Sequence, residues 1–201
     1  NTKPEAIYAD FNTSTSVPGT YKLSVGQLAQ NDSIRSTAVS SQTADQNGTN
    51  AATVVITVGT GAATTLTLGA GATSLDDLVT GINNLDIDVT ARVVEVSTGS
   101  YRVVVEGPQG ADNALTITDS VFGITTNTSA ASYSSSSKTQ TAQNATVTVN
   151  GLSVSRSSNE VDDLVPGLKL DLMAVTSSDV VLSVSRNTST AKSAITNLVA
   201  A

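Results

Sequence analysis

Three pairs of neighbouring carboxylates are the residues of this chain whose type and spacing could do chemistry. They are Asp76-Asp77, Asp86 with Asp88, and Asp162-Asp163. Two carboxyl groups can act as a general acid and a base, and carboxylate oxygens are ligands that Ca²⁺ prefers. None of the pairs lies in the Asp-x-Asp-x-Asp-Gly spacing of a calcium loop. Because Asp76 and Asp77 fall in the first turn of an expected helix, where the helix dipole favours negative charge, we interpret the pairs as structural.

Two other sets of residues match the residue types and spacing of catalytic or phosphate-binding motifs. Ser135-x-x-Lys138 and Ser189-x-x-Lys192 match the spacing of penicillin-recognising enzymes, but no Ser-Asp-Asn or Lys-Thr-Gly motif supports them. Gly59-x-Gly61 and Gly69-Ala70-Gly71 invite a phosphate-loop interpretation, but no Gly-Lys-Ser/Thr follows. We interpret the first set as accidents of a Ser-rich composition and the second as turns.

Six asparagines begin Asn-x-Ser/Thr triplets. A chain rich in Asn, Ser and Thr contains such triplets by chance, so we expect these residues to be unmodified. They are Asn12, Asn31, Asn47, Asn127, Asn144 and Asn187.

Composition excludes most enzyme chemistries and several partners. The chain has no Cys and no His, which removes disulfides, thiolate ligands, cysteine nucleophiles and the commonest general base. Its net charge of −7 and the absence of a Lys/Arg cluster argue against a nucleic-acid partner. No apolar run approaches the roughly 20 residues that cross a bilayer, so no membrane association is expected. The sequence therefore predicts a protein that is not an enzyme, with no catalytic, cofactor-binding or metal-binding residues and no cofactor.

Short runs in which apolar and polar residues alternate predict that the chain is built mainly from strands. Only 3% of the residues are aromatic, so the core must be built from Val, Leu, Ile and Ala. Abundant Ser, Thr and Val favour strands over long helices. The alternation predicts strands over residues 21–25, 53–58, 64–68, 89–93, 101–105, 115–117, 147–149, 152–154, 168–172 and 180–185.

One helix and three hairpins are also predicted. Leu75, Leu78, Val79 and Ile82 have the i, i+3, i+4, i+7 spacing of a helix that lies on a sheet, and Ser74 with Asp77 forms a capping box. The sequence Asn150-Gly151 is typical of a type I′ hairpin turn, which needs positive φ at both residues. Loops at 59–61 and 98–100 indicate two more hairpins.

The fold class expected is α+β, mainly antiparallel β, with two small domains, the second inserted into the first. Ser/Thr-rich stretches at 31–50 and 125–141 are interpreted as connections between the domains. The first domain is placed at 1–45 and 136–188, the second at 46–135, and the start of a C-terminal helical or coiled-coil region at 189–201. Because the chain opens without Met and stops on an apolar helical pattern, we expect a fragment of a longer protein.

Several blocks of sequence resemble the bacterial flagellar filament-cap proteins (hook-associated protein 2). The blocks occur in the family's order and span most of the chain. One of them is similar to the flagellin hook "IN" motif that recurs in such proteins. The blocks are 19–30 (GTYKLSVGQLAQ), 73–84 (TSLDDLVTGINN, the "IN"-like block), 89–91, 101–103, 110–115, 142–151 (AQNATVTVNG), 156–159 (RSSN), 165–170 (VPGLKL) and 184–188 (VSRNT).

This resemblance implies a structural component of the filament cap. Such a protein would self-associate into a cap ring in its full-length form, promote flagellin folding and insertion, and lie outside the cell at the distal tip of the flagellum. An extracellular adhesin that binds host mucin or glycan is an alternative, although the chain has no Trp and few other aromatic residues for stacking on sugars. An enzyme is the third class considered.

Overall fold

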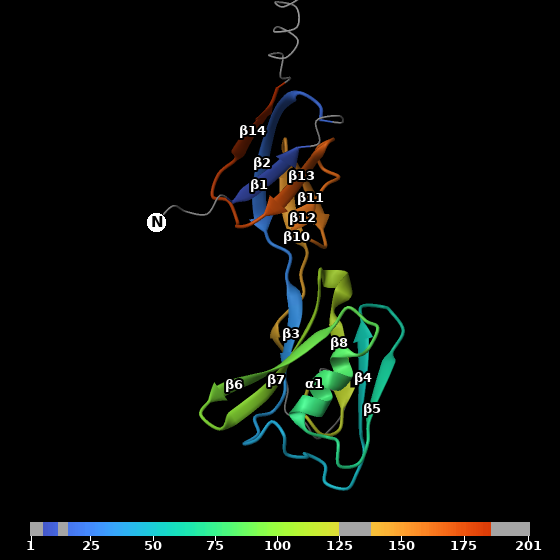
Figure 1. Cartoon of the computed structure of the whole chain (residues 1–201). Coiled ribbons are helices and arrows are strands. Elements are labelled where there is room, and N and C mark those ends of the chain that lie inside the picture. The colour runs from blue at the N-terminus through green and yellow to red at the C-terminus, as the bar shows by residue number, and fades with distance from the viewer. Residues whose placement is uncertain (1–5, 12–15, 125–137, 186–201) are drawn as a thin grey trace, which may run out of the picture. The chain divides into compact units, whose positions relative to one another are not determined.

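A computed structural model describes residues 6–11, 16–124 and 138–185 of the chain. The chain divides into two compact units (Figure 1). Unit 1 comprises residues 1–28, 146–155 and 159–201, and unit 2 comprises residues 29–145 and 156–158.

Unit 1 is built from two β-sheets, with strand orders β1-β13-β12 and β11-β10-β2-β14. Strands β2 and β13 alternate between buried and more exposed residues, as period-2 side-chain geometry requires. Leu168, Leu170 and Leu172 of β13 are buried, as are Leu23 and Val25 of β2. The strands of unit 1 are β1 (Ile7–Phe11), β2 (Gly19–Gln27), β10 (Ala145–Val149), β11 (Leu152–Arg156), β12 (Glu160–Val161), β13 (Leu168–Leu172) and β14 (Val180–Val184).

The turn between β10 and β11 has the geometry that its sequence predicts. Asn150 has φ 49° and Gly151 has φ 86°, so both central residues lie at positive φ. The Asn150 side chain also fixes this turn to β2, because its Oδ1 accepts a 2.9 Å hydrogen bond from the backbone N–H of Lys22. The predicted hairpin is confirmed.

Unit 2 contains a helix and two sheets, with strand orders β6-β7-β3-β9 and β5-β4-β8. Figure 1 shows helix α1 among the strands of this unit. The elements are β3 (Asn31–Arg35), β4 (Ala52–Val58), β5 (Thr64–Leu68), α1 (Leu75–Asn83), β6 (Thr90–Ser97), β7 (Ser100–Gln109), the 3₁₀ turn η1 (Ala111–Asn113), β8 (Leu115–Asp119) and β9 (Lys138–Gln140). The pairings of β4 with β5 and of β6 with β7 are antiparallel, which confirms the predicted hairpins.

Helix α1 begins and packs as its sequence predicts. The Ser74 hydroxyl accepts a hydrogen bond from Asp77 N, and the Asp77 carboxylate accepts one from Ser74 N, which completes the capping box. Leu75, Leu78 and Ile82 are buried on the face that contacts β5, β6 and β7. These residues join a largely aliphatic cluster in unit 2, in which Phe122 is the one fully buried aromatic side chain among the described residues.

Two stretches interpreted as connections contain strands of unit 2. Strand β3 lies within 31–50 and pairs with β7 and β9, and β9 lies within 125–141. Only Ile34 in β3 is apolar, but Asp32 and Ile34 are both buried and alternate along one face. Because the inward position of Asp32 is charged, the apolar alternation that predicts a strand is absent from β3. Residues 29–45 and 138–145 consequently belong to unit 2 and not, as the boundaries 1–45 and 136–188 required, to unit 1.

Two more strands of unit 1 were not predicted. Strand β1 lies in the polar N-terminal region and pairs with β13, and β12 is only two residues long. The helix expected from residue 189 lies outside the described residues. Within the described part of the chain, no helix has the length and apolar character needed to cross a membrane.

Candidate functional site

The carboxylate pair Asp76-Asp77 serves the start of α1. Asp77 is the third residue of the helix and is bonded to the cap residue Ser74, as described above. The backbone N–H of Asp76 donates a 3.2 Å hydrogen bond to the carbonyl of Gln42. Both carboxylates lie in the first turn, where they interact favourably with the helix dipole. This arrangement explains the pair by folding rather than by chemistry.

The other two carboxylate pairs are exposed. Asp86 and Asp88 lie between α1 and β6, and Asp162 and Asp163 follow β12. Within residues 6–11, 16–124 and 138–185, no three acidic side chains gather in a group that could hold a metal ion.

The glycine-rich segments form turns. Gly59 has φ 55° and donates its N–H to the carbonyl of Ala114, while Gly61 N–H donates to the carbonyl of Val58. Gly71 also has positive φ, and the Ala72 N–H closes a turn onto the carbonyl of Gly69. The first segment connects strands β4 and β5. The second lies between β5 and α1, but it lacks the Gly-Lys-Ser/Thr of a phosphate-binding loop.

The Ser-x-x-Lys matches do not form a site among the described residues. Ser135, Ser189 and Lys192 lie outside that part of the chain. Lys138 is described, and its ammonium pairs with Asp32.

The described asparagines of the Asn-x-Ser/Thr triplets use their side chains within unit 2. Asn31 Oδ1 accepts a hydrogen bond from Gln140 Nε2, and Asn144 Oδ1 accepts one from the Ala111 N–H. Asn47 Nδ2 donates to the carbonyl of Ala51. The remaining triplet asparagines, Asn12, Asn127 and Asn187, lie outside the described residues.

Asp32 is a buried carboxylate that the sequence reasoning missed. Its Oδ2 accepts hydrogen bonds from Lys138 Nζ at 2.7 Å and from Leu115 N at 2.6 Å, and its Oδ1 accepts one from Ala142 N at 2.7 Å. The carboxylate thereby links β3 to the first residues of β8 and β9. Because a buried charge is tolerated only when it is paired and hydrogen-bonded, these contacts explain why the chain keeps an ion here. No local sequence signal identifies the pair, since Asp32 and Lys138 are 106 residues apart.

Asp119, at the end of β8, accepts hydrogen bonds from four successive backbone N–H groups. Its Oδ1 accepts from Val121, Phe122 and Gly123, and its Oδ2 accepts from Ile124 at 2.7 Å. The carboxylate satisfies a turn that places Phe122 and Ile124 in the core. An Asp followed closely by Ser120 and Gly123 is a turn signal that the sequence reasoning passed over.

The Arg92–Glu106 and Lys169–Glu160 ion pairs lie on the surface. Arg92 forms a bidentate pair with Glu106 across β6 and β7, and its hydrogen bonds lower the pKa of Glu106 and raise that of Arg92. A hydrogen bond to Glu160 likewise raises the pKa of Lys169. Such exposed pairs indicate surface structure rather than a reactive centre.

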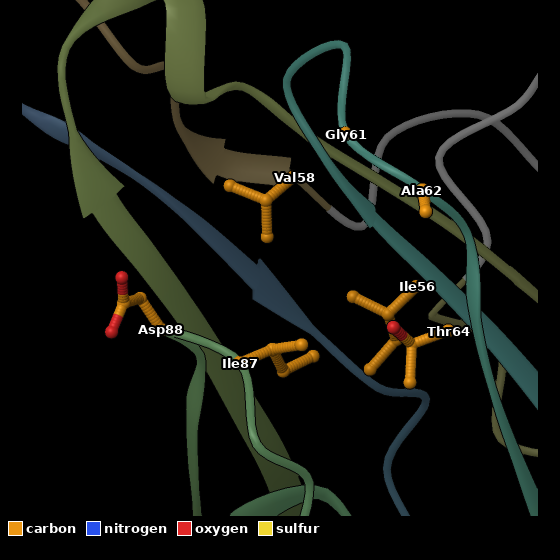
Figure 2. Close-up of a pocket in the computed structure, with 7 residues that line it drawn as sticks. All are labelled: Ile56, Val58, Gly61, Ala62, Thr64, Ile87 and Asp88. Carbon is orange, nitrogen blue, oxygen red and sulfur yellow. The ribbon is translucent and has the colours of Figure 1, made fainter.

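A small depression in unit 2 is lined mainly by apolar residues. Its volume is about 320 Å³, and it lies between β4, the loop from β4 to β5, and the segment that precedes β6 (Figure 2). The lining residues are Ile56, Val58, Gly61, Ala62, Thr64, Ile87 and Asp88. Asp88 is the one ionisable residue of this lining.

Comparison with known proteins finds one matching family model and several similar solved structures. A family model described as the C-terminus of flagellar hook-associated protein 2 matches residues 142–201. The chain is also similar to the D1-D2-D3 domains of the flagellar cap protein FliD from Escherichia coli, with 28% identity and a TM-score of 0.80 over 98% of this chain and 58% of that one. The chain is therefore similar to flagellar cap proteins over nearly its whole length.

Two-domain structures of this family correspond to nearly the same extent of chain. The D2-D3 domains of the Escherichia coli cap protein share 26% identity and a TM-score of 0.80, covering 92% of this chain and 96% of that one. The D2-D3 domains from Serratia marcescens share 29% identity and a TM-score of 0.77, covering 90% and 100%. No curated protein sequence gives a match.

The cap-protein resemblance and the mainly antiparallel α+β fold expected from the sequence are therefore confirmed. The chain spans 58% of the length of the three-domain Escherichia coli structure that it matches. It is consistent with a fragment of a cap protein.

Proposed function

We propose that this chain is a structural component of the bacterial flagellar filament cap and that the protein containing it promotes flagellin folding and insertion at the distal filament end. The similarity to the Escherichia coli cap protein over 98% of the chain carries this proposal. The proposed partners are other copies of the same protein, which form a cap ring, and flagellin. The proposed location is extracellular, at the distal tip of the flagellum.

The buried carboxylates of unit 2 are consistent with a structural role. The buried carboxylates Asp32 and Asp119 accept hydrogen bonds from backbone N–H groups of unit 2, so their contacts serve the fold. The function would then rest on shape and on contacts between copies.

Deletion in the bacterium that encodes the protein tests this role. We expect that removing residues 29–145 from the full-length protein prevents filament growth and leaves unassembled flagellin in the culture medium. The matched control is the full-length protein with Thr80→Ala, an exposed position on α1, which should keep normal filaments. Electron microscopy of the cells and immunoblots of the medium give the readout. Normal filaments in the deletion strain would contradict a role of unit 2 in assembly.

Self-association is expected to depend on the longer protein. Each copy carries a net charge of −7, so bringing copies together costs electrostatic energy, which salt screens beyond about 8 Å at physiological ionic strength. We expect the isolated chain to be mostly monomeric and the full-length protein to form a ring. Light scattering at micromolar concentration, at low and high salt, tests this expectation. A discrete multi-subunit mass for the isolated chain in both conditions would show that these two units hold the ring together.

The alternative of a mucin- or glycan-binding adhesin has less support. Tyr8 is 57% exposed, whereas the other described tyrosines, Tyr21 and Tyr101, are partly buried. Sugar sites commonly use several exposed aromatic faces. A mucin and glycan array probed with the full-length protein would distinguish the two functions, since reproducible binding would favour the adhesin.

A further inference from the structure

We propose that the depression beside Asp88 in unit 2 binds a short extended segment of a partner polypeptide, in which an apolar side chain is next to a lysine or arginine. This inference goes beyond the proposed cap role, which assigns no ligand to this depression.

The lining of the depression fits one apolar side chain. Figure 2 shows the side chains of Val58, Ile87, Ile56 and Thr64 directed toward a common space. The volume of about 320 Å³ lies at the lower end of the range of small-molecule sites, roughly 300–1,000 Å³. A single aliphatic or aromatic side chain would cover apolar surface that is otherwise in contact with water.

The carboxylate of Asp88, which borders the depression, favours a positively charged ligand. Asp88 is exposed, and Figure 2 shows its carboxylate directed away from Ile56 and Thr64. Within the described part of the chain, no hydrogen bond or ion pair engages the Asp88 side chain. A lysine or arginine of a partner can therefore pair with Asp88 without displacing an existing contact.

Unit 2 itself offers few free cations to Asp88. By sequence it contains five basic and ten acidic residues, a formal net charge of −5. Arg92 pairs with Glu106, Lys138 pairs with Asp32, and Arg102 donates to the carbonyl of Ser36. The negative field of the unit favours a partner that brings its own positive charge.

The strand beside the depression favours a polypeptide over a sugar or a simple ammonium ion. Thr64, which lines the depression, is the first residue of β5, and β5 lies at one edge of the sheet β5-β4-β8. The unpaired backbone N–H and C=O groups of an edge strand can form a row of hydrogen bonds with an extended peptide. A sugar or an ammonium ion has no backbone with which to form such a row. The lining also contains no aromatic residue on which a sugar ring could stack.

Nuclear magnetic resonance titration of the ¹⁵N-labelled chain with blocked tetrapeptides tests the proposal. The probe is acetyl-Thr-Leu-Lys-Thr-amide, and the controls are acetyl-Thr-Leu-Glu-Thr-amide and acetyl-Thr-Gly-Lys-Thr-amide. We expect amide shifts to concentrate at Val58, Ala62, Thr64, Ile87 and Asp88. The Leu-Lys peptide should bind at least threefold more tightly than either control, and its affinity should fall as salt is added.

Matched variants separate the charge from the shape. Asp88→Asn should lower the affinity for the Leu-Lys peptide roughly two- to fivefold, as expected for an exposed ion pair. Asp86→Asn makes the same charge change at a residue outside the lining and should lower the affinity less than Asp88→Asn does, because Asp86 does not border the depression. Ala62→Leu, at an exposed position, should fill the depression and reduce binding. The dispersion of the amide spectrum shows that each variant is folded.

Four outcomes would overturn the proposal. They are no localised shifts with the Leu-Lys peptide, shifts centred elsewhere, equal binding of the Leu-Glu peptide, and equal loss of affinity in Asp86→Asn and Asp88→Asn. Butylammonium chloride and glucose serve as additional probes. Localised shifts with either of these, and none with the peptides, are a case of the first outcome and would assign the depression to a different class of ligand.

Discussion

The ammonium group of Lys138 lies 2.7 Å from Oδ2 of Asp32, a carboxylate with 0% exposure in unit 2. The same carboxylate accepts the N–H groups of Leu115 and Ala142, so one side chain connects β3, β8 and β9. Removing either partner of such a pair leaves a buried charge or several N–H donors without compensation.

Lys138→Met should therefore destabilise unit 2 by about 3 kcal/mol, because the Asp32 carboxylate would stay buried without its cation. Urea unfolding followed by circular dichroism measures the change. Lys169→Met removes an exposed ammonium that pairs with Glu160 and should leave the unfolding midpoint nearly unchanged. Equal effects of the two substitutions would contradict the role assigned to the Asp32–Lys138 pair.

Leu78→Ala should destabilise unit 2 by about 2 to 4 kcal/mol. The Leu78 side chain is fully buried on the inner face of α1, so its truncation loses transfer free energy and leaves a cavity. Thr80→Ala, on the exposed face of the same helix, should change stability by less than about 0.5 kcal/mol. Denaturation midpoints that fall together for both variants would show that the helix face is assigned wrongly.

Gly59→Ala should destabilise unit 2 more than Gly99→Ala does. Both glycines have positive φ, which costs a substituted alanine about 1 kcal/mol or more. At Gly59 the added Cβ would also collide with the carbonyl oxygen of Asp112, whereas at Gly99 it meets no atom within 4 Å. Thermal unfolding of the two variants gives the comparison, and an equal loss of stability would rule out the predicted collision at Gly59.

The Arg92–Glu106 pair predicts a small pH-dependent contribution to stability. The hydrogen bond from Arg92 lowers the pKa of Glu106. The contribution is therefore present above the ordinary Glu pKa, about 4.3, and is lost as the pH falls through the lower folded-state pKa. Glu106→Gln should cost about 0.5 kcal/mol at pH 7 and less at pH 3, as measured by urea unfolding. A difference that does not depend on pH would show that charge is not the cause.

Unit 2 should fold on its own when it is excised as residues 29–145, but not as residues 46–135. The shorter segment lacks β3, which pairs with β7 and β9 and places Ile34 in the core. Without this strand, β7 loses a neighbour and apolar surface is exposed to water. Calorimetry of the two segments should show a cooperative transition only for 29–145. A comparable transition for 46–135 would mean that β3 is dispensable.

The sequence predicted correctly the elements that depend on neighbouring residues. Asn150-Gly151 determines a hairpin because both residues tolerate positive φ, and Ser74 with Asp77 determines where α1 begins because capping involves residues three apart. Leu75, Leu78 and Ile82 identified the buried face of the helix by their spacing alone. The ordered blocks also identified the cap-protein family, which the comparisons confirm.

By itself, the sequence determined the strand-rich fold class, the single described helix, several turns and the family, since each of these follows from local pattern or from resemblance. Only the tertiary structure decided that β3 and β9 belong to unit 2 and that Asp32 is buried beside Lys138. The physical reason is that a polar strand such as β3 has no local apolar alternation to reveal it. Its inward carboxylate is tolerated only because donors from residues 115, 138 and 142 reach it in the folded chain.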